Sequence, residues 1–213
     1  MNVAGKICVV TGGASGIGKA LASRFVAEGA KAVVIADLNA DSVSSVAAQM
    51  GAQSFALDVR DETAIASMVA AIEAEHGQID LFCSNAGIIG VDGAPWWATG
   101  ADNDMWQRMW EIHLMSHVYA ARACLPGMIA RGEGYFLNTA SAAGLLAQIG
   151  SAPYSVTKHA AVSFAECLAI THADDGIKVS CLCPQAVDTA MTAGTEGGGV
   201  AGVDGMLSAD AVA

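Results

Sequence analysis

Short apolar runs alternate along this chain with segments in which hydrophobic residues recur every three or four positions. The runs predict six strands, over Lys6–Thr11, Ala32–Ala36, Ser54–Leu57, Ile79–Ser84, Tyr135–Thr139 and Lys178–Cys183. The periodic segments predict helices over Gly16–Gly29, Ala40–Met50, a stretch capped by Asp61 that runs through Ile72, Asp104–Ala130 and Tyr154–Ala173. Such regular alternation predicts an α/β fold, with a parallel sheet covered by helices on both faces.

No segment rich in proline or charge interrupts this pattern between Met1 and Cys183, so a single domain over residues 1–213 is the simplest organisation. The stretch Gly194–Gly205 is rich in glycine, and no lysine or arginine follows Lys178. This composition predicts a mobile loop rather than core.

The 213 residues are 54% hydrophobic and carry a formal charge of −11, from 10 basic and 21 acidic side chains. The apolar content excludes a disordered chain, and the acidic balance argues against nucleic acid and anionic membrane surfaces as partners. The apolar runs are far shorter than the roughly 18–20 residues of a membrane span. The N-terminus shows no secretory signal, so we expect a cytoplasmic protein without a membrane partner.

The six cysteines are expected to be buried small hydrophobic residues in a reducing cytosol rather than partners in disulfides. No C-x-x-C pair is present. Cys181 and Cys183 share one face of a predicted strand, which is poor evidence for a metal site, and no metal is expected.

The segment Thr11–Gly18 joins the first predicted strand to the first helix and carries four glycines, with the spacing G-x-x-x-G-x-G from Gly12 to Gly18. Glycines there let the backbone turn tightly and approach a pyrophosphate at the helix N-terminus. Because a helix entry can need glycine for structural reasons alone, the turn by itself is weak evidence for a nucleotide site. The cofactor contacts expected within it are Gly12, Ser15, Gly16, Ile17 and Gly18.

Asp37 ends the second predicted strand about twenty residues after this turn. A carboxylate there can accept hydrogen bonds from the adenosine ribose hydroxyls and would repel a 2′-phosphate. The next residues, Leu38 and Asn39, bring no positive charge, so the cofactor expected is NAD rather than NADP. The alternative is that Asp37 merely caps the following helix.

Tyr154 and Lys158 lie four residues apart and share one face of a predicted helix. A nearby ammonium favours the phenolate and would move the tyrosine pKa down toward neutral pH. Ser141 lies thirteen residues earlier at the end of the fifth predicted strand, and Asn85, Ala86 and Gly87 end the fourth. In open α/β sheets this is the edge that binds ligands.

These residues, in this order, resemble the short-chain dehydrogenase/reductase family of the common single-domain type. The likeness covers Lys6 to Met191 and includes the segment from Pro184 to Thr189 after the sixth strand. It implies a doubly wound Rossmann sheet, usually of seven strands. It also assigns Asp58 and Val59 to the adenine ring, and Pro184, Val187 and Thr189 to the nicotinamide end.

The resemblance implies reversible hydride transfer between nicotinamide and a carbinol carbon. Tyr154 would act as general acid/base, and Ser141 would hold the substrate oxygen. Lys158 would bind the nicotinamide ribose and lower the pKa of Tyr154.

Two positions depart from the family pattern. His113 stands where the family has a helical asparagine that supports a relay water beside the lysine. Either the imidazole still bonds such a water, which would make His113 part of the catalytic set, or the ring packs in a slightly different site. Gln185 stands where glycine is usual, and it either narrows the nicotinamide end or points away.

The segments expected on the substrate side are mainly apolar and carry no lysine or arginine to clamp an acid, which favours a neutral, fairly hydrophobic secondary alcohol or ketone. Trp96, Leu145 and Gln148 are the candidate contacts, and residues 190–207 correspond to the family's substrate lid. Trp96 and Trp97 could instead seal their loop onto the core.

A non-catalytic NAD-binding sensor or scaffold protein is the alternative function. Family members form homodimers or homotetramers, here through residues such as Met115, Val118, Tyr119, Phe164 and Leu168, although the same side chains could face the sheet. Leu207–Ala213 resembles the start of the helix before the family's last strand. The family's seventh, C-terminal strand is therefore expected to be missing.

Overall fold

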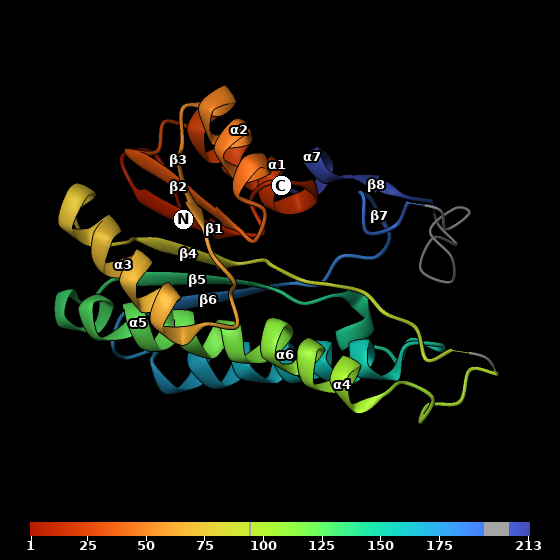
Figure 1. Cartoon of the computed structure of the whole chain (residues 1–213). Coiled ribbons are helices and arrows are strands. Elements are labelled where there is room, and N and C mark those ends of the chain that lie inside the picture. The colour runs from red at the N-terminus through yellow and green to blue at the C-terminus, as the bar shows by residue number, and fades with distance from the viewer. Residues whose placement is uncertain (94, 194–204) are drawn as a thin grey trace.

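The computed structural model describes residues 1–93, 95–193 and 205–213. Six parallel strands form one sheet in the order β3-β2-β1-β4-β5-β6 (Figure 1). The strands are β1 (Ile7–Thr11), β2 (Ala32–Asp37), β3 (Gln53–Ala56), β4 (Leu81–Ser84), β5 (Gly134–Thr139) and β6 (Ile177–Leu182). The six predicted strands are confirmed to within two residues at each end, and so is the doubly wound α/β class.

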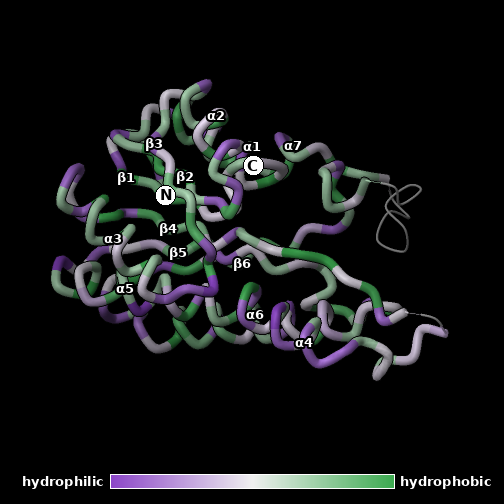
Figure 2. The backbone as a smooth tube through the Cα atoms, in the orientation of Figure 1, coloured by the Kyte–Doolittle hydropathy of each residue, from purple (hydrophilic) through white to green (hydrophobic). Residues whose placement is uncertain are grey.

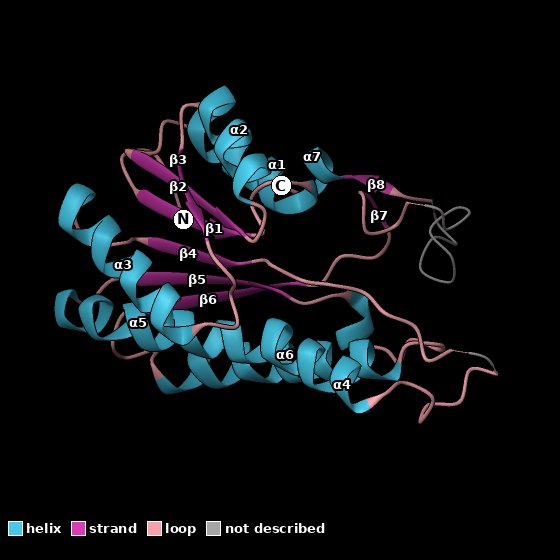
Figure 3. Ribbon diagram, viewed as in Figure 1, coloured by secondary structure: helices cyan, strands magenta, loops and turns pink. Residues whose placement is uncertain are grey.

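Helices cover both faces of this sheet, as Figure 3 shows. On one face lie α1 (Gly16–Ala27) and α2 (Ala40–Met50). On the other lie α3 (Glu62–His76), α5 (Ser116–Arg131) and α6 (Ala152–Thr171). Asp61 is confirmed as the N-cap of α3, since its side chain accepts a hydrogen bond from the amide of Ala64.

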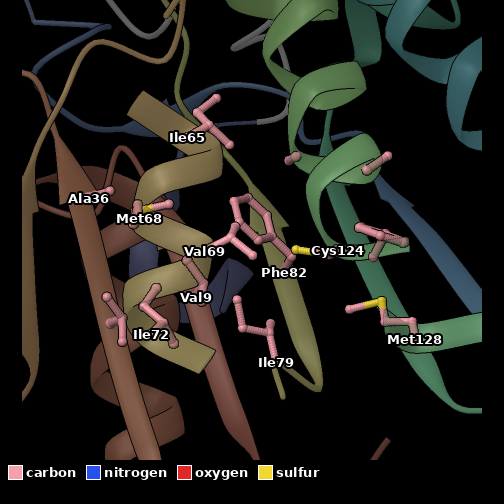
Figure 4. Close-up of a cluster of buried hydrophobic side chains, with 14 of the residues drawn as sticks. Val9, Ala36, Ile65, Met68, Val69, Ile72, Ile79, Phe82, Cys124 and Met128 are labelled. Carbon is pink, nitrogen blue, oxygen red and sulfur yellow. The ribbon is translucent and has the colours of Figure 1, made fainter. Parts of the chain in front are cut away.

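The side chains of each strand alternate between two hydrophobic layers. In β1, Ile7 and Val9 pack with α3 and α5, whereas Cys8 and Val10 pack with α1 and α2. Figure 4 shows part of the first layer, where Phe82 of β4 meets Val69 of α3. Hydrophobic positions accordingly follow the strands in Figure 2. Burial on both faces explains why the strands read as continuous apolar runs.

The predicted single helix over Asp104–Ala130 is not regular. It consists of α4 (Asn103–Trp110), the one-turn π-helix η1 (Glu111–Met115) and α5. A π-turn adds one residue to a helix, and such turns often mark functional positions. The simple three-to-four periodicity could not reveal it.

The strand order reverses beside β1. The chain passes from β1 outward through β2 to β3 and then returns to β4, which pairs with the other side of β1. The segments that follow β1 and β4 therefore leave toward opposite faces of the sheet, and open α/β sheets bind their ligands at this point.

After β6 the chain forms a short strand, β7 (Val187–Asp188), which pairs in parallel with β8 (Leu207–Ser208). The helix α7 (Ala209–Val212) follows β8 directly. Ser208 caps α7, so the helix start predicted at Leu207–Ala213 is confirmed. All of the glycine-rich stretch except Gly205, and most of the predicted lid, fall on residues 194–204, which lie outside the described residues.

The expectation that all six cysteines are buried needs correction. Cys167 is exposed, and Cys181 and Cys183 are half-buried with their sulfur atoms 3.8 Å apart, so the cysteines are not uniformly core residues. His117 is a packing residue inside the protein, and burial lowers its pKa to about 3.

Candidate functional site

The turn between β1 and α1 has the geometry of a phosphate cradle. Gly16 has φ +51°, a left-handed conformation that favours glycine. A Cβ atom on Gly18 would collide with the carbonyl oxygen of Gly12. Ser15 precedes the helix in extended backbone and makes no side-chain cap, so the first amides of α1 are not capped by it.

Asn85 and Thr11 join the ends of β4 and β1 at this turn. The Thr11 hydroxyl accepts hydrogen bonds from the amides of Asn85, at 3.0 Å, and Ala86, at 3.2 Å. The Asn85 side chain donates to the Thr11 carbonyl at 3.2 Å. Asn85 and Ala86 thus brace the cofactor turn; Gly87 comes next, and a Cβ atom there would lie 3.6 Å from Lys158 Nζ.

The Asp37 carboxylate lies beside the glycine turn. It accepts hydrogen bonds from the amide of Ala14 at 3.2 Å and from that of Asn39 at 3.3 Å. Asn39, not Asp37, caps α2, since its side chain accepts from the Ser42 amide. The alternative that Asp37 merely caps this helix is therefore wrong. Leu38 beside it is exposed, with an apolar side chain free to cover an adenine face.

The next strand end presents Asp58 and Val59. Val59 is buried, and Asp58 is held by Arg60, whose guanidinium donates to the carboxylate at 2.6 and 2.9 Å. These hydrogen bonds lower the pKa of Asp58 below its ordinary value and keep it ionised.

Tyr154 and Ser141 meet above the end of β5. Ser141 begins the short 3-10 helix η2 (Ala142–Gly144), and Tyr154 lies in the first turn of α6 and is buried. Burial raises the pKa of the Tyr154 phenol, and a hydrogen bond with Ser141 acts in the opposite direction. The expected low pKa is thus not found in this structure, because desolvation outweighs the polar partner.

Lys158 lies one turn further along α6 and is buried. Its Nζ donates to the Thr139 carbonyl at 3.0 Å and lies 5.6 Å from the centre of the Tyr154 ring. Burial lowers the pKa of Lys158 to about 8, while Cys181 and Cys183 raise it. A Cβ atom on Gly144 would lie 2.6 Å from the Lys158 carbonyl, so η2 needs glycine to sit against α6.

His113 occupies the centre of η1, fully buried, with its ring edge-on to that of Tyr154 at 5.4 Å. Its Nδ1 lies 2.8 Å from the Thr157 hydroxyl, and its Nε2 lies 3.1 Å from the amide nitrogen and 3.0 Å from the carbonyl oxygen of Ile88. The Thr157 hydroxyl directs its single proton at the Pro153 carbonyl, 2.7 Å away, so Nδ1 is the donor in the first contact.

Nε2 of His113 therefore accepts from the Ile88 amide. An asparagine side chain could form hydrogen bonds with both the N–H and the C=O of Ile88, whereas the imidazole bonds only the N–H. Burial lowers the pKa of His113 well below its ordinary value, so the ring is neutral. Both ring nitrogens contact protein groups, which favours the packing alternative over a direct bond to a relay water.

The segment after β6 closes over the same region. The Pro184 carbonyl accepts from the amide of Ala142 at 2.8 Å, and Val187 is buried. A Cβ atom on Gly16 would lie 3.1 Å from Thr189, which brings this segment onto the glycine turn. The Gln185 side chain is exposed.

The predicted substrate residues do not cluster as closely as the predicted catalytic residues. Trp96 and Trp97 are 69% and 68% exposed, so the alternative that they seal their loop onto the core is wrong. Trp96 has φ +66°, a strained conformation for a bulky residue. Leu145 is exposed directly after η2, and the Gln148 amide donates to the Ser155 hydroxyl at 3.2 Å.

Sequence reasoning missed two residues that contact this machinery. Thr157 holds the ring of His113, and Asp92 accepts hydrogen bonds at the start of α6. Thr157 lies inside the segment from Tyr154 to Lys158 and could have been found from its helical spacing. No signal in the sequence points to Asp92.

The described residues contain no helix that is long and apolar enough to cross a bilayer. The same part of the chain shows no group of three or more histidine, cysteine, aspartate or glutamate side chains placed to hold a metal ion.

Comparison with known proteins places this geometry in context. Residues 6–197 match the sequence profile described as short chain dehydrogenase. The 1-deoxy-11-beta-hydroxypentalenate dehydrogenase of Streptomyces exfoliatus is 36% identical, over 100% of this chain and 78% of its own. The 3beta-hydroxysteroid dehydrogenase 2 of Eggerthella lenta is 35% identical, over 85% and 71%. A solved short-chain dehydrogenase from Streptomyces avermitilis superposes with a TM-score of 0.79 at 31% identity, covering 88% of this chain and 68% of that one.

Proposed function

The chain belongs to the short-chain dehydrogenase family of oxidoreductases, which use a nicotinamide cofactor, and we propose that it interconverts a secondary alcohol and a ketone. The observation that carries the proposal is the cluster of Tyr154, Ser141 and Lys158 at the carboxyl ends of the strands beside the glycine turn. The cofactor, when bound, accepts or supplies the hydride.

The protein's part in the reaction is to hold the oxygen and move its proton. Ser141 shares a hydrogen bond with Tyr154 and would orient the substrate oxygen, while Tyr154 gives or takes the proton. Because burial keeps the phenol protonated at neutral pH, Tyr154 is prepared to act as the acid in ketone reduction. Alcohol oxidation needs the phenolate, so its rate should rise with pH.

The residues at the nucleotide end fit a dinucleotide. The cradle of Gly12, Gly16 and Gly18 would hold the pyrophosphate, Val59 and Leu38 would flank the adenine, and Lys158 would reach the nicotinamide ribose. We propose NAD rather than NADP, because the Asp37 carboxylate lies at the glycine turn, where it can bond a ribose diol and repel a 2′-phosphate. Asp37→Ala should reduce the ratio of NAD affinity to NADP affinity. Equal affinity of the wild-type protein for NAD and NADP would contradict the assignment.

The proposed substrate is neutral and fairly hydrophobic. Large apolar side chains are exposed next to the catalytic residues and on the loop after β4, among them Leu145, Leu146, Ile149, Trp96 and Trp97. The names of two relatives describe alicyclic hydroxyl groups, on a pentalenate and on a steroid. A ring-bearing secondary alcohol is therefore the first substrate class to test.

We propose that the chain assembles into a homodimer or homotetramer, as members of its family do. Leu168 lies in the core, and Tyr119 and Phe164 are partly buried against it, which supports the alternative that these side chains face the sheet. Val156 and Ile170 are the exposed apolar residues of α6. Light scattering of the intact protein decides between monomer and oligomer.

The test of the reaction is the absorbance of reduced nicotinamide with a panel of alicyclic secondary alcohols and their ketones. Turnover is expected with NAD, and Tyr154→Phe should lower kcat by about 10²–10⁴-fold while leaving cofactor affinity unchanged. Tight NAD binding with no turnover on any panel member would favour the sensor or scaffold alternative.

A further inference from the structure

Three contacts tie the loop between β4 and α4 to the start of α6. The Asp92 carboxylate accepts from the amide of Ala152 with both oxygens, at 2.9 and 3.0 Å. The Asp92 amide donates to the Gly150 carbonyl at 2.9 Å, and the Ser151 hydroxyl donates to the Gly90 carbonyl. The loop and the helix start therefore hold each other through both backbone and side chains.

Asp92 supplies the helix cap that α6 lacks locally. Ser151 occupies the N-cap position, yet its side chain makes no capping bond and donates to Gly90 instead. The cap is provided by Asp92, sixty residues earlier in the chain. Asp92 is only 3% exposed, and a carboxylate at a helix N-terminus also interacts favourably with the helix dipole.

The capped residue is two positions from the tyrosine of the proposed reaction. Ala152 and Tyr154 lie in the same first turn of α6, so the position of this turn determines the position of the Tyr154 phenol. The base of the same loop is fixed by the bond between the Ile88 amide and His113, whose ring contacts that of Tyr154. The loop is thus attached to the surroundings of Tyr154 at both Ile88 and Asp92.

The rest of this loop carries the exposed indoles. A Cβ atom on Gly100 would collide with the Asp92 carbonyl, so the returning half of the loop packs directly on Asp92. Trp96 and Trp97 lie between these two points. Figure 1 shows the loop, in yellow-green, extending past the end of the sheet before it enters α4.

We propose that Asp92 is a positioning residue, which couples the tryptophan-bearing loop to the first turn of α6 and so sets the place of the Tyr154 phenol relative to the substrate. This inference rests on the proposed function and deepens it. A helix cap with a purely structural role would affect stability alone, whereas a positioning residue also affects the rate of the step in which Tyr154 takes part.

The experiment compares Asp92→Ala and Asp92→Asn with a matched cap, Asp61→Ala, which removes the N-cap of α3 near the adenine end rather than beside Tyr154. The kcat of all variants is measured at saturating cofactor. Asp92→Ala should lower kcat by about 10- to 100-fold with little change in cofactor KM, because small displacements of reacting groups cost rate. Asp92→Asn should restore most of this loss, since its amide oxygen can still accept from Ala152. Asp61→Ala should lower the melting temperature and leave kcat unchanged.

Ser151→Ala removes the hydrogen bond from the Ser151 hydroxyl to the Gly90 carbonyl, and it replaces Asp92→Ala in the experiment if that variant does not fold. Ser151→Ala should lower kcat by a smaller factor than Asp92→Ala. The proposal is overturned if kcat of Asp92→Ala, or of Ser151→Ala in its place, equals that of the wild type at a temperature where both are folded. It is also overturned if Asp92→Asn is as impaired as Asp92→Ala. Wild-type turnover is measured first, since its absence counts against the proposed function, whereas turnover that is insensitive to Asp92 counts against Asp92 alone.

Discussion

The cofactor side and the catalytic side of this sheet are held together in different ways. Around the glycine turn, part-buried polar contacts join the ends of adjacent strands, as between Ala14 and Asp37 or between Thr11 and Asn85. Around Tyr154, fully buried polar contacts join different elements, as between His113 and Thr157 or between Lys158 and Thr139. Contacts of the first kind follow from the strand ends, whereas contacts of the second kind depend on how several elements pack together.

The largest expected effect lies on the catalytic side, at Lys158. Its buried ammonium has a pKa of about 8, so at pH 7 the folded protein must keep a charge away from water. Lys158→Met should lower kcat by at least about 10²-fold and raise the free energy of unfolding at pH 7 by up to about 3 kcal/mol.

The sign of this gain can be checked against pH. Between about pH 8 and 10.5 the lysine binds more protons in the unfolded state than in the folded state. The free energy of unfolding that the wild-type protein loses by burying the Lys158 charge therefore becomes smaller as pH rises through that window. Urea unfolding of both proteins at pH 7 and pH 10 should therefore show the gain falling. A variant that is less stable at pH 7 would contradict this account.

An intermediate effect is expected on the cofactor side, at Gly18. Gly18→Ala forces the backbone of Gly12 to move, at a cost of about 1–3 kcal/mol, which corresponds to roughly 5- to 150-fold in NAD affinity. Gly127→Ala is the matched control in α5, where the nearest atom lies 3.5 Å from the added carbon. Calorimetric titration measures both, and unchanged affinity in Gly18→Ala would show that the turn does not bind phosphate.

The smallest effect is expected at His113. Since the pKa of His113 lies well below its ordinary value, the ring stays neutral near neutral pH. The titration of His113 should therefore not change kcat in that pH range. His113→Asn exchanges the Thr157 contact for a second bond to Ile88, so kcat should change by less than about threefold. A rate limb that disappears in the variant would assign His113 a direct part in proton transfer.

The same contrast explains what could be predicted from the sequence. The strands and the glycine turn are local patterns, so hydrophobic runs and the spacing of Gly12, Gly16 and Gly18 were enough to place them. Ser141, Tyr154 and Lys158 were found through their family resemblance and the strand ends, and the structure gathers them beside β5.

The missed features depend on tertiary contact. Asp92 looks like any loop aspartate until α6 is folded beside it, and the pKa of Tyr154 is governed by burial that no spacing reveals. The exposure of Trp96 and Trp97 likewise follows from how the loop folds back on Asp92 rather than from their hydrophobicity.

The π-turn at Glu111–Met115 also determines how α4 and α5 can serve different neighbours. One residue more than a regular helix turns everything after it by about 100° around the axis. Met109 before the turn can therefore face Tyr154, while Ala120 and Cys124 after it face the sheet. Deleting a single residue here would rotate the core face of α5 toward solvent, so a change in length should disturb the core far more than a substitution at this turn.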